Sequence, residues 1–452
     1  MNITQLVAEH IVRTEYKDLP AKTLERIRVQ VIDSVGVIAS SIHAPSIDST
    51  VALMRRLGGE GEASVLFHNL RIPAHQAAFV NSLMMRSFDF GMITSDGPNN
   101  VNKPDHASES VVPAAFAAAE AVGASGEEFV TALAVGNDIA ARLAYATGGR
   151  YGGSFGNTGT LNGLASVGIA SKLFKLDVQQ TRDAFGLALA ALGGTADGVG
   201  DSVTSFKLPV ALASRNGIFS AQLALGDFSS NTDAINGKSG YFALFGGGTD
   251  TPETILDGLG EVFYADCEIK PWPGCRATHT AATCAAKMIE KEALDSSQIV
   301  EVIIRQPESS RFVGKRLGDG RELLGDALFS VRFAVCCLLA KGELKAKNES
   351  MEYFNDPEIR RLHDKTEIIY SDSKTTSVEV KLADGSTRIE EADRARGHIV
   401  FDPLPFESVL EKYWDNIGFA KALPKEKAQE AIDMILRIEE LSDFRSLVSL
   451  LA

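Results

Sequence analysis

A ten-residue segment, Lys270 to His279, is the part of this sequence with the clearest capacity for chemistry. Its order is Lys-Pro-Trp-Pro-Gly-Cys-Arg-Ala-Thr-His, so two cations, a thiol and an imidazole lie close together. Cations can hold an anionic group, and an imidazole can transfer a proton near neutral pH. The prolines at 271 and 273 fix two φ angles and remove two backbone donors, which excludes a helix. We therefore expect a stiff extended or turning segment that suits a site.

The sequence before this segment is dominated by helical patterns. Apolar residues recur at spacings of three and four, and alanine-rich stretches predict helices that approach one another closely. Helices are expected over residues 4–13, 21–40, 109 to about 123, 126–146, 158–175, 178–192 and 208–226.

The composition changes after about residue 266. Residues 298–306 alternate and are rich in β-branched side chains, and residues 376–390 are typical of a hairpin around Ala383-Asp384-Gly385-Ser386. Further helices are expected over 276–291, 324–341, 406–418 and 424–450. We predict a mainly α protein. Its large all-helical domain is built from both chain ends, 1–266 and 403–452, and is interrupted by a smaller α+β domain at 267–402.

Composition and charge limit the possible partners. The chain has 452 residues and a net charge of −14, which argues against nucleic acid or an anionic membrane surface as a partner. It shows neither a signal peptide nor eighteen uninterrupted apolar residues, so we expect no membrane span and a cytoplasmic location. The five cysteines lack zinc-finger or redox spacing and are expected to be reduced. Two glycine-rich stretches, 193–200 and 246–248, lack the context of a nucleotide-binding loop.

Several motifs in a fixed order carry a resemblance to a known family. Residues 270–279 closely resemble the Lys-Pro-Tyr-Pro-Cys-Cys-Arg-x-x-His signature of the MmgE/PrpD family. This family includes 2-methylcitrate dehydratase, cis-aconitate decarboxylase and iminodisuccinate epimerase. Further matches lie at residues 78–82, 88–90, 113–120, 123–126, 158–160, 205–207 and 396–398. The resemblance thus extends over nearly the whole chain.

The resemblance implies a set of active-site residues. It nominates Asp89, His106, Lys207 and Lys270. Removing a proton next to a carboxylate needs a base with a pKa near neutrality, which His106 provides, and the resulting enediolate-like charge needs fixed cations, which the lysines provide. This chemistry requires neither a metal nor an organic cofactor. Asp89 stands between two phenylalanines, and a buried carboxylate there needs a partner.

The departures from the family pattern are also informative. The family's Asp-Phe-Asp-Asp-Thr becomes Asp89-Phe90-Gly91-Met92-Ile93, which removes two carboxylates and a hydroxyl, and an insertion at 95–103 follows. Asn157 stands where relatives carry a histidine, and an amide can orient a substrate but cannot shuttle a proton. The decarboxylase carries another histidine at the position of Cys275, whereas the dehydratase-like motif has a cysteine there, as this chain does.

Three further residues complete the candidate set. Cys275 and His279 are candidate substrate-binding residues together with Lys270 and Asn157, with a packed thiol and a structural imidazole as the alternatives for the first two. Tyr151 lies near the position of a tyrosine that the epimerase branch pairs with the lysine matching Lys207. Tyr151 and Lys207 would then face each other across one substrate carbon, and one would remove its proton while the other returned a proton to it.

The leading hypothesis is a cofactor-independent lyase that acts on a small anionic di- or tricarboxylate. Proton abstraction next to a carboxylate would lead to loss of water or of CO2. One alternative is an epimerase that uses Tyr151 and Lys207, and another is a non-catalytic ligand-binding protein on the same fold. The family resemblance also implies a homodimer joined through the helical domain, with residues 267–402 as a lid over the site.

Overall fold

The computed structural model describes residues 2–95, 105–148, 155–292 and 294–452. Helices form most of it, and the predicted mainly α fold class is confirmed. Within these ranges, none of the helices is both long enough and apolar enough to cross a membrane. The domain boundaries at 266 and 402, the homodimer, the lid movement and the cytoplasmic location stay predictions.

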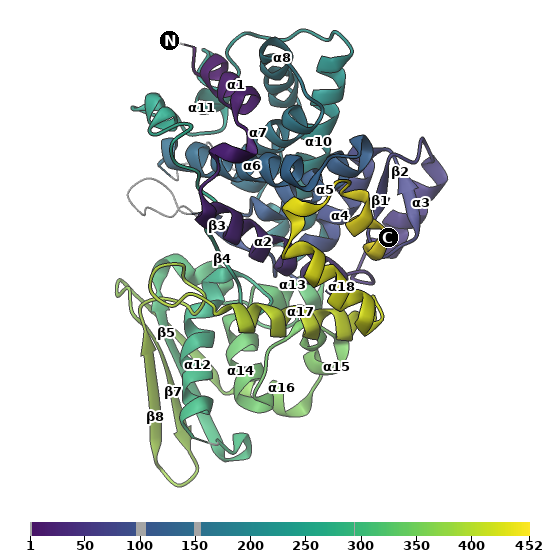
Figure 1. The fold of residues 1–452 in the computed structure, drawn as a ribbon. Coiled ribbons are helices and arrows are strands. Elements are labelled where there is room, and N and C mark those ends of the chain that lie inside the picture. The colour runs from purple at the N-terminus through teal and green to yellow at the C-terminus, as the bar shows by residue number, and fades with distance from the viewer. Residues whose placement is uncertain (1, 96–104, 149–154, 293) are drawn as a thin grey trace.

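The N-terminal part is a stack of long helices (Figure 1). At its centre α5 (Ser108–Val122), α6 (Gly126–Ala146), α7 (Asn157–Leu173) and α10 (Leu208–Leu225) pack on one another, and α4 (Ala74–Arg86) packs on α5 and α10. A Cβ at Gly217 of α10 would lie 2.3 Å from the Cβ of Ser166 in α7, so glycine permits this close approach. The other helices here are α1 (Ile3–Arg13), α2 (Ala21–Ser40), α3 (Ile47–Leu57), α8 (Val178–Leu189), α9 (Asp197–Gly200) and α11 (Tyr241–Leu244).

A four-stranded sheet lies in the second half of the chain. Its strands are β5 (Ile299–Pro307), β6 (Thr366–Ser371), β7 (Thr376–Leu382) and β8 (Thr387–Ala392), in the order β6-β5-β7-β8. The pair β5 and β6 is parallel and the other pairs are antiparallel. The predicted hairpin is β7 and β8, with Gly385 at φ 86° in its turn. Strand β6 was missed by the sequence analysis.

The helices beside this sheet differ in detail from those predicted. Residues 324–341 form two helices, because Ser330 caps the second one through the Phe333 N–H. The predicted helix over 424–450 is likewise split in two. The helices of this half are α12 (His279–Lys291), α13 (Leu323–Leu328), α14 (Val331–Lys341), α15 (Met351–Phe354), α16 (Pro357–Asp364), α17 (Phe406–Ala420), α18 (Lys425–Ile435) and α19 (Arg445–Leu451).

The C-terminal segment returns to the N-terminal helices. Helix α17 packs along α2, and α19 packs on α5 (Figure 1). The Phe444 ring stacks on Phe129 of α6 at 4.1 Å between centroids and meets Phe116 of α5 edge-on. Buried aromatic contacts thus join the two ends of the chain.

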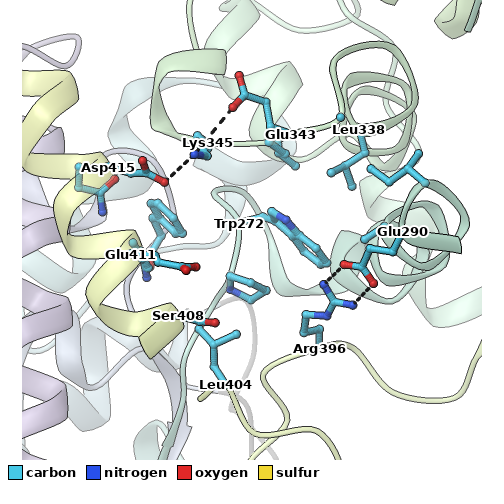
Figure 2. Close-up of a pocket in the computed structure, with 18 residues that line it drawn as sticks. Trp272, Glu290, Leu338, Glu343, Lys345, Arg396, Leu404, Ser408, Glu411 and Asp415 are labelled. Atoms are coloured by element: carbon cyan, nitrogen blue, oxygen red, sulfur yellow. Dashed lines mark hydrogen bonds and ion pairs between the residues drawn. The ribbon is translucent and has the colours of Figure 1, made fainter. Parts of the chain in front are cut away.

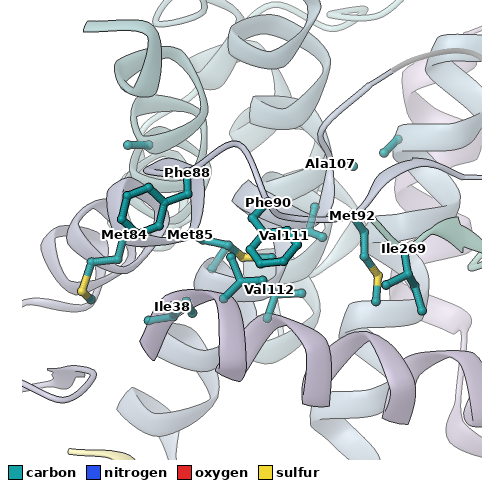
Figure 3. Packing of buried hydrophobic residues seen from close by; sticks show 14 of the residues in the cluster. Ile38, Met84, Met85, Phe88, Phe90, Met92, Ala107, Val111, Val112 and Ile269 are labelled. Atoms are coloured by element: carbon teal, nitrogen blue, oxygen red, sulfur yellow. The ribbon is translucent and has the colours of Figure 1, made fainter. Parts of the chain in front are cut away.

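Two short antiparallel strand pairs and an apolar cluster lie near α4 and the segment that follows it. Strands β1 (Ala63–Val65) and β2 (Leu70–Ile72) pair beside α4, and β3 (Ile93–Ser95) pairs with β4 (Cys267–Glu268). Figure 3 shows Phe88 and Phe90 packed among buried side chains of α2, α4 and α5. Because both phenylalanines are buried, the backbone at the intervening Asp89 has little freedom.

A buried ion pair ties the C-terminal return to this segment. Lys412 of α17 lies 2.7 Å from Asp33 of α2, donates to the Phe90 carbonyl at 3.0 Å and covers the Phe90 ring. Both side chains are almost fully buried. Burying two charges costs free energy unless each stays paired.

We expect Lys412→Met to lower the free energy of unfolding by about 3–5 kcal/mol, because Asp33 would remain buried without a counter-charge. The double variant Asp33→Asn with Lys412→Met should recover part of this loss, since it buries no net charge. Urea unfolding of the three proteins measures both effects. Equal losses in the single and double variants would contradict the ion-pair account.

Candidate active site

The candidate site is built around a strained turn at Asp89. This residue has φ 45°, in the left-handed region that non-glycine residues rarely adopt. Three consecutive carbonyls of the turn accept hydrogen bonds from two separate parts of the chain, the signature segment and α17. Phe88 accepts from the Gly274 N–H at 3.0 Å, Asp89 from Lys270 Nζ at 2.6 Å and Phe90 from Lys412 Nζ at 3.0 Å. The surrounding structure therefore fixes a conformation that the sequence alone would not favour.

Lys270 uses all the hydrogen-bond donors of its ammonium group within the protein. Besides the Asp89 carbonyl, its Nζ contacts Asp89 Oδ1 at 2.5 Å and the Gly274 carbonyl at 3.1 Å. An ammonium group has three donors, and all three are used within the protein. Lys270 can therefore stabilise a bound anion through its charge, whereas a direct hydrogen bond to substrate requires one of these contacts to open.

Arg86, at the end of α4, is the centre of the site, and the sequence analysis missed it. Its Nη1 lies 2.7 Å from Asp89 Oδ1, 2.8 Å from His106 Nδ1 and 3.0 Å from Glu109 Oε2. Arg86, Asp89 and Glu109 are all buried. The available signal was the spacing of three residues between Arg86 and Asp89 and between His106 and Glu109, which places each pair on one side of a helical turn.

His106 is a neutral imidazole in this arrangement. A guanidinium group can only donate, and Arg86 Nη1 lies 2.8 Å from His106 Nδ1 and 3.3 Å from Nε2. We therefore assign the nearer nitrogen, Nδ1, as the acceptor and place the proton on Nε2. Burial and the charge of Arg86 lower the pKa of His106, while Glu109 and Asp89 oppose this change. The His106 carbonyl accepts from Asn162 Nδ2 at 3.1 Å, which anchors the residue just before α5. The imidazole, with one-fifth of its side chain exposed, can take up a proton at Nδ1 once the contact with Arg86 opens.

Asp89, His106 and Glu109 also have the spacing of a metal site, since one ligand atom of each lies within 4.8 Å of the others. However, Arg86 Nη1 lies within 3.0 Å of an atom of each residue, at the position that a cation would take. The arginine thus supplies the positive charge there, and the residues fit an ion-pair cluster better than a metal centre.

Lys207 makes no hydrogen bond or ion pair with this cluster among the described residues. It follows Phe206, whose ring lies 5.4 Å below the Arg86 guanidinium, but its own Nζ donates to the Pro45 carbonyl at 2.9 Å. Burial lowers the pKa of Lys207 to about 8, and the charge of Glu322 partly opposes this. Lys207 is thus a buried ammonium without a close carboxylate among the residues described.

Cys275 and His279 lie near the turn. The charge of Asp89 and, above all, burial raise the pKa of the Cys275 thiol to about 11, so the thiol stays protonated and is a poor nucleophile. His279 is buried with a pKa well below its usual value, and its Nδ1 lies 3.4 Å from Arg276 Nη1. Asp89 Oδ2 and His279 Nε2 have no hydrogen-bond partner among the described residues.

Asn157 and Tyr151 are the two remaining predicted site residues. Asn157 is the first residue of α7. Tyr151 and residues 96–103 of the predicted insertion lie outside the described residues. The roles proposed for Asn157 and Tyr151 therefore stay predictions.

The signature segment has a structural role as well. Arg276 bonds Glu268 at 2.8 Å and the Arg396 carbonyl at 2.7 Å, which fixes residues 395–398 against the segment. Gly397 has φ 87°, and a Cβ there would lie 2.2 Å from the Ile269 carbonyl oxygen. These contacts hold the signature segment and the motif at residues 396–398 together.

A separate groove of about 530 Å³ lies between α12, α14 and α17 (Figure 2). Trp272 and Phe90 line it, but Asp89, His106, Lys207 and Lys270 do not. Two cations of this groove are paired with carboxylates that also line it, Arg396 with Glu290 at 2.7 Å and Lys345 with Asp415 at 2.7 Å. The groove is therefore distinct from the candidate active site.

Known proteins resemble this chain along its length. Residues 5–254 match the MmgE/PrpD N-terminal domain, and residues 272–440 match the MmgE/PrpD C-terminal domain. Human cis-aconitate decarboxylase is 24% identical over 487 residues, which cover 100% of this chain and 94% of the relative. The mouse enzyme is 24% identical over 85% of this chain and 79% of the relative. Cis-aconitate decarboxylase of Aspergillus terreus is 22% identical over 96% and 92%.

Lys207→Met tests whether the buried ammonium weakens the fold. The pKa of Lys207 in the folded protein, about 8, lies below the unfolded value of about 10.4. The buried ammonium therefore lowers the free energy of unfolding by its full amount below pH 8, and this destabilisation disappears as the pH rises toward 10.4. We expect the variant to be more stable by about 1–2 kcal/mol at pH 7, after allowing for the lost bond to Pro45, and the gain to shrink by pH 10. Urea unfolding at both pH values measures it, with the exposed Lys374→Met as control. A variant less stable at pH 7 would contradict this.

Proposed function

The chain belongs to the MmgE/PrpD family, and from this premise we propose that it is an enzyme that removes a proton next to a carboxylate group of a small di- or tricarboxylate. We infer a lyase outcome, with loss of water or CO2. One observation carries the proposal: a neutral imidazole, His106, lies against a buried array of fixed charges formed by Arg86, Asp89, Glu109 and Lys270. The similarity to cis-aconitate decarboxylases supports a carboxylate substrate.

In the proposed first step, His106 accepts the proton from the carbon next to the substrate carboxylate. The electrons of the broken C–H bond move onto that carboxylate and form an enediolate. Preorganised cations lower the free energy of such an anion more effectively than water does, because they need not reorient. Expulsion of a β-hydroxyl group, which leaves as water after taking a proton, completes a dehydration. In a decarboxylation the enediolate first regains a proton at carbon, the bond to a second carboxylate then breaks to release CO2, and the electron pair left on carbon takes up a final proton.

The cations have different parts in this proposal. Arg86 holds Asp89, His106 and Glu109 through one nitrogen, while its Nε has no hydrogen-bond partner among the described residues. Arg86 is therefore the cation best able to meet a substrate carboxylate. Lys270 acts through its charge and by holding the Asp89 turn. Lys207 adds a second cation if substrate draws its Nζ away from Pro45.

The enzyme should exchange or convert a carbon-bound proton of its substrate. Incubation in D2O with citrate, 2-methylcitrate, cis-aconitate, malate, tartrate and aspartate, followed by proton NMR, detects this. His106→Asn should lower the rate at least about 100-fold, because a general base typically contributes about 10²–10⁴. The exposed Lys374→Met is the matched control. If an acid binds but none exchanges or reacts, the chain is a ligand-binding protein instead.

The pH dependence of turnover tests the charge state of Lys207. If Lys207 acts as a cation, kcat/KM should fall as the pH rises through about 8, where its ammonium loses a proton. Lys207→Arg cannot deprotonate in this range, so any residual activity should lack that alkaline fall. A wild-type profile that rises through pH 8 would identify Lys207 as a base, against this assignment.

A further inference from the structure

Glu109 occupies the space that a side chain at position 91 would need. A Cβ built on Gly91 would lie 2.7 Å from Glu109 Cγ and 2.8 Å from Glu109 Oε1. Both distances are shorter than the 3.0 Å below which a Cβ is essentially never found from a neighbouring atom. A side chain at position 91 and the observed position of Glu109 therefore exclude each other. The family pattern Asp-Phe-Asp has a carboxylate at position 91, two residues after Asp89. In this chain a carboxylate from another element fills that place.

Glu109 is held firmly and in contact with the site. It lies in the first turn of α5, where the helix dipole favours a negative charge, and it is fully buried. Its Oε2 lies 3.0 Å from Arg86 Nη1 and 3.5 Å from His106 Nδ1. The carboxylate therefore faces both the central cation and the imidazole.

The charges around His106 indicate what this carboxylate does. Arg86 from α4 opposes protonation of the imidazole, whereas Asp89 from the turn and Glu109 from α5 favour it. The neighbouring Asp105 is buried, and burial raises its pKa to about 7. Without Glu109, one cation and one anion would face His106, and a protonated imidazole would lose the nearer of its two acceptors. Glu109 Oε2 lies at 3.5 Å from Nδ1 and Asp89 Oδ1 at 3.9 Å.

We propose that Glu109 is a positioning residue that replaces the carboxylate lost at Gly91 and stabilises His106 in its protonated form. This inference rests on the proposed function, since the protonated imidazole is the form that arises when His106 takes the substrate proton. The pair Gly91 and Glu109 then forms one unit, in which the absence of a side chain at 91 makes room for the carboxylate from α5.

Four variants test the proposal. Glu109→Gln keeps the shape of the side chain and removes its charge, whereas Glu109→Ala removes both. Gly91→Asp alone forces an aspartate against Glu109, and Gly91→Asp with Glu109→Ala moves the carboxylate back to position 91. Glu120→Gln is the matched control, because Glu120 is a second buried glutamate of α5 that bonds Ser64 and Arg71 instead of the site.

NMR titration of the His106 ring, assigned by the signal lost in His106→Asn, is the direct readout. The pKa of His106 should fall in Glu109→Gln and Glu109→Ala, return toward the wild-type value in the double variant, and stay unchanged in Glu120→Gln. With a reacting substrate, kcat should fall at least about tenfold in Glu109→Gln with little change in KM, and recover in the double variant. The acid limb of its pH profile should move to lower pH.

An unchanged His106 titration in Glu109→Gln, or a double variant that titrates like Glu109→Ala, would overturn the proposal. Thermal unfolding of each variant identifies any that fails to fold, and the isosteric Glu109→Gln then decides. The titration needs no turnover. A chain that converts none of the acids would therefore refute the proposed function and still leave the interaction between Glu109 and His106 measurable.

Discussion

The left-handed turn at Asp89 is the constraint on which the rest of the site depends. An aspartate with positive φ, buried between two phenylalanines, is unfavourable unless its neighbours hold it. The three carbonyls of the turn are held by residues of the signature segment and by Lys412 of α17. The site therefore forms only when the N-terminal helices, the segment at 270–274 and the C-terminal return have come together. This dependence explains why the chain returns to its first helices after the sheet.

Charge pairing is the second organising feature. Arg86 and Lys270 share Asp89, Arg86 also meets Glu109, and Lys412 meets Asp33. Each buried cation of this cluster thus has a buried anion, as low-dielectric surroundings require. Lys207 is different, because the Pro45 carbonyl is the only hydrogen-bond partner of its ammonium group among the described residues. A group kept buried without a paired charge is more consistent with a role toward an anionic ligand than with one in stability.

Much of the fold could be read from the sequence, because periodic apolar residues report local structure. The helices over residues 21–40 and 126–146, the hairpin after residue 376 and the stiffness of the signature segment follow from such patterns. Arg86 and Glu109 could not be found in this way, since their importance arises from contacts between separate elements. The three contacts of Lys270 Nζ and the exclusion of a side chain at 91 by Glu109 likewise needed the three-dimensional arrangement. Gly91 was noted as a loss of charge, and only the structure reveals the carboxylate that fills its place.

The most direct test of the account is a crystal structure with tricarballylate, a tricarboxylate without a hydroxyl or a double bond to react. We expect one ligand carboxylate to contact Arg86 and a ligand carbon to lie within reach of His106. This expectation would be contradicted by a ligand bound in the separate groove lined by Trp272 and Lys345, with the cluster around Arg86 unchanged.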